Sequence, residues 1–194
     1  PHNGNLSNGR MFEETTFTGG PMTKAYAESR QKWEPLFELT QTKGQSESNP
    51  VLSPTDEFAS WDLWDRGNLN GAAKKPEMLR TEYWREALKS GLRLEAALCV
   101  NPFKYGANAA TDTHTALATG DEDNFWGKFV GAEPSATRWK PVMIGAGQPG
   151  QIYSWEQAAS GYTGVWATSN TRAAIWDAMK RRETFATTGP RMSV

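Results

Sequence analysis

The two histidines of the chain and one nearby carboxylate are the residues best suited to chemistry. His2 lies among small and polar residues at the start of the chain, and Asp112 and His114 flank Thr113. On an extended segment, residues two apart point to the same side, so a carboxylate and an imidazole could hold one cation. Neutral imidazole with carboxylate suits zinc, manganese or iron. Such a triplet also occurs by chance, so the pattern alone leaves a purely structural role open.

Asp112 is expected at the carboxyl end of a strand. Residues 105–111, just before it, are dominated by Gly and Ala, so neighbouring backbone can approach closely. A second strand is predicted over 36–43, which follows Pro35 and ends at Gly44. Barrels and open α/β sheets place their chemistry at the carboxyl ends of strands. The sequence therefore predicts an α/β fold with Asp112 at its functional edge.

Helical patterns surround these strands. The apolar spacing over 78–90 predicts a helix that Gly91 stops. A last helix is predicted after Asn170, which would cap it, and a short strand follows over 185–188. Segment 134–161 is rich in Pro, Gly and Ser and predicts an irregular loop or lid.

Length and charge narrow the function classes. With 194 residues and no internal repeat, the chain is expected to form a single domain. A net charge of -1 and the lack of a long Lys/Arg block argue against nucleic acid as a partner. No apolar run approaches the roughly 18 residues of a membrane span. The single cysteine, Cys99, is expected to be a small core residue.

The compartment is left open. The chain starts at Pro1 without Met, and we expect it to be the later part of a longer product. A periplasmic or secreted location follows if an upstream signal peptide exists, and a cytoplasmic one otherwise.

Nine tryptophans offer a different function class. Clustered aromatic rings could form a surface that stacks against a glycan or a protein partner, although burial is the default for such residues. The alternative to an enzyme is therefore a non-catalytic binding or structural module with a Trp-rich surface.

An ordered series of segments resembles one known family over essentially the whole chain. The segments are PHNGNLSNG at 1–9, ELTQTKG at 38–44 with Ser46-Glu47 behind it, LSPTDEF at 52–58, DTHT at 112–115, DEDNF at 121–125, and NTR at 170–172 through ATTGPR at 186–191. Together they resemble a large bacterial family of unknown function (DUF3604-type) related to the polymerase and histidinol phosphatase (PHP) superfamily of metal-dependent phosphoesterases.

The resemblance implies the later strands and helices of a PHP-like distorted (β/α) barrel, with long irregular loops and a cluster of divalent metal ions. A metal-bound hydroxide would attack a phosphoester or another small-molecule substrate. By position, His2 matches a late barrel histidine of the family, and Asp112 with His114 matches its closing Asp-x-His. Glu38 or Glu47 matches an acidic position, Glu38 being the tentative further ligand. Residues expected to contact substrate or to support the ligands are Asn3, Asn5, Glu47, Thr113, Asp121 and Asp123.

One departure from the family qualifies this expectation. The superfamily begins with a His-x-His strand and has further ligands ahead of the position of His2, and none of these occurs in the 194 residues. We therefore expect the chain to be a fragment of a metal-dependent hydrolase whose missing N-terminal barrel half, or another chain, completes the site.

Overall fold

A parallel pair of strands forms the centre of the structure. The structure is a computed structural model, and it describes residues 1–117, 119–124, 128–129, 135–158 and 161–189. Strand β1 (Leu36–Gln41) pairs in parallel with β3 (Gly106–Ala109), and β2 (Gly44–Gln45) turns back antiparallel along β1. The predicted strand is confirmed, but it ends at Gln41, and Gly44 begins β2 after a tight turn. This glycine has φ 85°, and a Cβ there would lie 2.7 Å from the carbonyl oxygen of Asp62, so a side chain would disrupt the turn.

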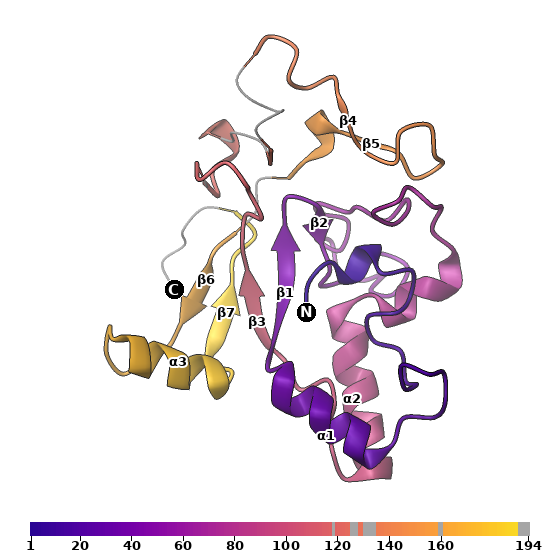
Figure 1. Cartoon of the computed structure of the whole chain (residues 1–194), viewed down its shortest axis with the longest axis vertical. Helices are drawn as coiled ribbons and strands as arrows, with labels where there is room; N and C mark the ends of the chain where they lie inside the picture. Colours follow the sequence, from indigo (N-terminus) through magenta and orange to yellow (C-terminus); the bar gives the residue numbers. More distant parts are fainter. Residues whose placement is uncertain (118, 125–127, 130–134, 159–160, 190–194) are drawn as a thin grey trace.

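A pair of strands near the C-terminus lies beside β3 (Figure 1). Strands β6 (Thr163–Val165) and β7 (Thr184–Ala186) pair antiparallel, and the Thr163 hydroxyl bonds both the N–H and the carbonyl of Ala109, at 3.0 and 2.7 Å. The predicted final strand is thus confirmed, although it begins one residue and ends two residues earlier than expected. Within the described ranges the strands form one three-stranded and two two-stranded sheets, and none of these closes into a barrel. The fold class is mixed α/β.

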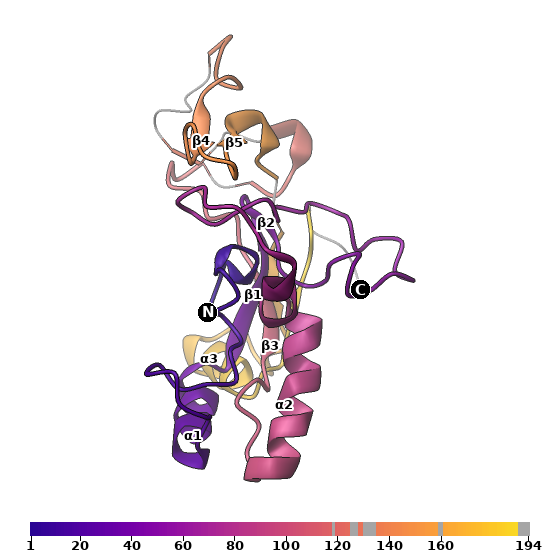
Figure 2. The ribbon, with the colours of Figure 1, turned by 90° about the vertical axis from the view of Figure 1, so that its right-hand side faces the viewer.

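Two helices flank the lower part of β1 and β3 in Figures 1 and 2, α1 (Lys24–Trp33) and α2 (Trp84–Leu98). Aromatic rings fill the core between these elements, with Phe12 packed edge-on against Phe37 at 5.0 Å and against Phe103 at 5.7 Å between ring centroids. Helix α1 was not among the predicted elements. Its only buried residue is Ala27, so the sequence carries little apolar periodicity there.

The predicted helix over 78–90 is wrong at both ends. Residues Pro76–Thr81 form a separate 3₁₀ helix, η2, and α2 then runs from Trp84 through Gly91 to Leu98. Gly91 does not stop the helix. A Cβ there would lie 2.3 Å from Oδ1 of the buried Asn101 side chain, so the glycine allows a close approach instead. Cys99 ends the helix in the left-handed conformation at φ 58° and is exposed, which corrects its expected place in the core.

The last helix is confirmed as α3 (Arg172–Lys180), with Ala174, Ile175, Ala178 and Met179 on its covered side. Its N-cap is Thr171, whose hydroxyl accepts the Ala174 N–H at 3.3 Å, one residue later than predicted.

The segment predicted as an irregular loop or lid contains a short hairpin in its described part, 135–158. Strands β4 (Val142–Ile144) and β5 (Ile152–Tyr153) pair antiparallel and lead into the 3₁₀ helix η5 (Ser154–Glu156). Ile144 and Ile152 pack against Trp64 and against Leu6 of the 3₁₀ helix η1 (Gly4–Leu6). The hairpin therefore lies over the start of the chain, near the carboxyl ends of β1 and β3. A further 3₁₀ turn, η3 (Glu122–Asn124), precedes it. No helix in the described ranges is long and apolar enough to cross a membrane.

Candidate functional site

The three predicted ligands line one cavity. This cavity, called the His2 cavity below, has a volume of about 350 Å³. It is lined by His2, Asp112 and His114 together with Asn3, Lys43, Leu69, Lys128, Phe129, Met143 and Ile144. The N-terminal segment reaches this place because the Glu38 N–H on β1 donates to the Pro1 carbonyl at 3.1 Å. Lys43 and Asp112 follow the carboxyl ends of the parallel strands β1 and β3, where open sheets place their chemistry.

Asp112 is the centre of the polar contacts in this cavity. It has φ 53°, the left-handed region, and its Oδ2 contacts the Nζ atoms of both Lys43 and Lys128. Lys128 also donates to the main-chain carbonyl of Asp112 at 2.6 Å. The side chains of Lys43 and Lys128 are only 6% and 5% exposed, so these ion pairs are shielded from solvent.

His114 touches the same group of charges. Its Nε2 lies 3.3 Å from Oδ1 of Asp112 and 3.2 Å from Nζ of Lys128, and its N–H donates to the Lys128 carbonyl at 2.7 Å. The charge of Lys128, then burial and the charge of Lys43, lower the pKa of His114. Burial and nearby positive charges, Lys43 and Lys128 among them, also lower the pKa of His2. Both imidazoles are therefore neutral at pH 7, the form that binds metals.

The two lysines share a single carboxylate. Asp112 can balance one ammonium, and a second buried ammonium beside it is repelled by the first. Burial and the neighbouring Lys128 lower the pKa of Lys43 to about 7. Burial likewise lowers the pKa of Lys128. The pair therefore holds an easily lost proton close to neutral pH.

Glu38 lies on β1 and interacts electrostatically with both lysines. Burial raises the pKa of its carboxyl group, and the opposing causes include a hydrogen bond from Gln41 Nε2 at 3.2 Å and the charges of Lys43 and Lys128. It is not among the residues that line the cavity. Glu38 thus contributes to the field at the two lysines rather than to the cavity wall.

The two asparagines of the N-terminal segment have different roles. Asn3 lines the cavity, and its buried Oδ1 has no hydrogen-bond partner within the described part of the chain. Both polar atoms of the Asn5 side chain form hydrogen bonds within the protein. Nδ2 donates to the carbonyls of Lys43 at 3.0 Å and Trp64 at 3.1 Å, and Oδ1 accepts from Ser46 Oγ at 2.9 Å. Asn5 therefore fixes the segment that carries His2, whereas Asn3 lines the cavity and has a buried side-chain oxygen that the described residues leave unpaired.

The comparison with protein families gives one result. The family described as a protein of unknown function (DUF3604) matches residues 1–194. The chain belongs to the DUF3604 family. Comparison with curated proteins and with solved structures gives no match.

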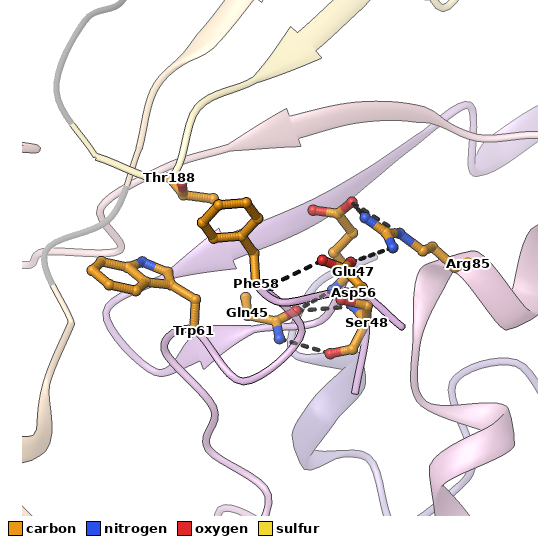
Figure 3. A pocket seen from close by; sticks show the side chains of 8 residues that line it. All are labelled: Gln45, Glu47, Ser48, Asp56, Phe58, Trp61, Arg85 and Thr188. Atoms are coloured by element: carbon orange, nitrogen blue, oxygen red, sulfur yellow. Dashed lines mark hydrogen bonds and ion pairs between the residues drawn. The ribbon is translucent and has the colours of Figure 1, made fainter. Parts of the chain in front are cut away.

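The other residues predicted for this DUF3604 chain do not line the cavity. Glu47 pairs with Arg85 in a second cavity (Figure 3). Asp121 and Asp123 are exposed, and the Thr113 hydroxyl lies 3.1 Å from that of Thr115; none of these three side chains lines the His2 cavity. The structure thus brings together His2, Asn3, Asp112 and His114 from the predicted set.

The donor types fit a divalent cation, although their present arrangement is that of an ion-pair network. Two neutral imidazoles and a carboxylate are ligands that zinc, manganese and iron accept. Within the described residues, however, no group of three or more His, Cys, Asp or Glu side chains has the geometry of a metal site. Oδ2 of Asp112 faces lysines instead. A cation at His2, Asp112 and His114 would have to displace at least one ammonium.

Sequence reasoning missed the two lysines. Lys43 follows β1 just as Asp112 follows β3, so the rule that located Asp112 could also have located Lys43. Lys128 carries no comparable signal, because it reaches Asp112 from a loop 16 residues later.

Proposed function

We propose that this DUF3604 chain is part of a metal-dependent hydrolase that acts on phosphoesters through a hydroxide bound to zinc, manganese or iron. The observation that carries the proposal is the meeting of His2, Asp112 and His114 in one cavity, although 110 residues separate the first two. A family resemblance to PHP phosphoesterases suggests the reaction. The same proposal makes β1 and β3 later strands of a PHP-like barrel that another segment or chain completes.

The residues of the chain suit an anionic substrate. A bound divalent ion would lower the pKa of water to about 7 and supply the nucleophile. Lys43 and Lys128 bring two ammonium groups to the cavity against one carboxylate, and this excess positive charge attracts phosphoryl oxygens. Because the pKa of Lys43 is about 7, its ammonium can also donate a proton to a leaving oxygen at neutral pH.

Metal content and phosphodiester hydrolysis test this proposal. Because the proposal has another segment or chain complete the barrel, the chain would be tested together with that part: loaded with Mn²⁺ or Zn²⁺, desalted, and assayed for bound metal and for cleavage of bis(p-nitrophenyl) phosphate. His114→Ala should lower both by orders of magnitude, because the nucleophile depends on the cation. Trp166→Ala is the matched control, since its indole is 58% exposed and has no ligand chemistry. Unchanged metal content in His114→Ala would refute the assignment of the site.

A second candidate function, the Trp-rich binding module, has its own observation. Most tryptophans were expected to be buried, yet six of those in the described ranges have side chains more than half exposed: Trp33, Trp61, Trp139, Trp155, Trp166 and Trp176. Trp126 lies outside the described residues. A binding module predicts that Trp155→Ala and Trp166→Ala reduce affinity for a glycan array or a protein partner, while His114→Ala has no effect.

A further inference from the structure

A second cavity of about 340 Å³ lies beside the loop that follows β2 (Figure 3). Glu47, Asp56, Phe58, Trp61 and Arg85 line it, and it shares no lining residue with the His2 cavity. The two cavities are therefore separate sites, and the chemistry of this one is argued independently of the proposed hydrolase.

Hydrogen bonds within the protein hold the polar wall of this cavity in place before any ligand binds. Arg85 on α2 donates to Oε1 of Glu47 through Nε at 3.1 Å and Nη2 at 2.7 Å, and to Oδ2 of Asp56 through Nη1 at 2.6 Å. The Gln45 side chain holds the turn that carries Glu47: its Oε1 accepts from the N–H groups of Glu47 and Ser48 at 2.7 and 3.0 Å. A ligand would therefore meet two carboxylates that need little further ordering.

The opposite wall consists of two exposed aromatic rings. Phe58 is 70% exposed and Trp61 is 56% exposed. Figure 3 shows both rings on one side of the cavity, with the ion pairs of Arg85 on the other. The faces of such rings carry partial negative charge and attract cations within about 6 Å.

The loop that follows β2 carries a net negative charge. Segment 45–65 contains five acidic residues and no Lys or Arg; the acidic residues are Glu47, Asp56, Glu57, Asp62 and Asp65. At the cavity, Arg85 supplies one positive charge against the two carboxylates of Glu47 and Asp56. The Phe58 N–H and Arg85 lower the pKa of Asp56, which keeps this carboxylate ionised. Both bonds from Arg85 to Glu47 end on Oε1, so Oε2 faces no donor from Arg85.

We propose that this cavity binds a small organic cation, an alkylammonium group held by Glu47 and Asp56 with its aliphatic part against Phe58 and Trp61. Charge complementarity carries the choice, because excess negative charge and two ring faces both favour a cation. An uncharged sugar, which could stack on the same rings, is the competing ligand that the experiment must separate.

Calorimetric titration of the full chain with cadaverine tests the proposal, with methyl glucoside as the uncharged probe. Cadaverine should bind, and its affinity should fall several-fold between about 0.02 M and 0.5 M salt. Trp61→Ala should weaken binding by about tenfold, because it removes one of the two aromatic rings that contact the aliphatic part of the ligand. Trp176→Ala is the matched control, because Trp176 on α3 is 61% exposed and lies outside this cavity.

Three results would overturn the proposal: no binding of cadaverine, binding of methyl glucoside in its place, or cadaverine binding that Trp61→Ala leaves unchanged. Glu47→Gln adds a test of the charge, and circular dichroism would check that each variant folds. Binding of cadaverine should be the same in His114→Ala, so failure of the hydrolase proposal and failure of this one can be distinguished.

Discussion

Replacing Lys128 by methionine should strengthen the binding of a divalent cation at the His2 cavity. The Lys128 ammonium contacts Oδ2 of Asp112 and lies 3.2 Å from Nε2 of His114, so it occupies two of the atoms that a cation would use. Methionine keeps most of the length and the apolar stem of lysine but has no charge. The variant therefore removes the competitor and leaves the donors in place.

The size of the effect follows from the charges. Two unit charges about 4 Å apart interact by about 4 kcal/mol at the effective dielectric constant typical of proteins. The Lys128 side chain is only 5% exposed, so solvent screens the repulsion weakly. The ammonium can still swing aside when a cation binds, and Lys43 remains beside Asp112. We therefore expect the free energy of metal binding to become more favourable by about 1.4–2.8 kcal/mol in the variant, which is about a ten- to hundredfold gain in affinity.

Titration of Mn²⁺ or Zn²⁺ into the two proteins measures this difference directly. Lys104→Met is the control, because Lys104 is exposed and does not line the cavity. Affinity for the metal that is equal to or weaker than that of the parent chain would refute competition between Lys128 and a cation. If the lysine also holds the substrate, the same variant should bind metal more tightly yet cleave bis(p-nitrophenyl) phosphate more slowly.

Three other outcomes are expected. The pKa of each histidine lies below its ordinary value of 6.5, so protonation of the imidazoles should weaken metal binding only below pH 6.5, whereas protonation of Lys43, with a pKa of about 7, should already weaken it around neutral pH; titrations from pH 8 to pH 5 would follow both steps. Lys74→Met leaves the fully buried Glu82 carboxylate without its ion pair and should cost about 3–5 kcal/mol in urea unfolding; the double variant with Glu82→Gln should cost less than the sum of the single changes. Gly91→Ala forces a Cβ to 2.3 Å from Asn101 Oδ1 and should lower stability by about 1–3 kcal/mol, whereas a stability equal to the parent would mean that Asn101 moves freely.

The sequence could predict the helices and strands that are marked by residues close together in the chain. The strand that became β1 is followed by a turn with Gly44 behind it, and α3 has a polar cap and an apolar stripe at helical spacing. The boundaries of α2 could not be predicted in this way. Gly91 resembles a helix stop in sequence, but its role is set by Asn101, whose position depends on the turn after Cys99.

The same distinction between local patterns and distant contacts applies to the residues of the candidate site. The rule that chemistry gathers at the carboxyl ends of strands located Asp112 correctly after β3, and His2 lines the same cavity. The rule says nothing about partners that arrive from loops. Lys128 reaches Asp112 from such a loop, while Glu47 faces Arg85 because α2 passes beside the β2 turn. Tertiary contacts of this kind have no periodic signature in the sequence.

The parallel pairing of β1 with β3 also bears on how the chain folds. Leu36 lies opposite Gly106, so 70 residues must form a closed loop before the two strands meet. Closing so long a loop is entropically unfavourable, and folds dominated by such distant contacts form slowly. Lys43 and Asp112 follow the two strands that this closure brings together. A nascent or partly folded chain can thus contain α1 and α2 and still lack the His2 cavity, which is completed only when the sheet itself is complete.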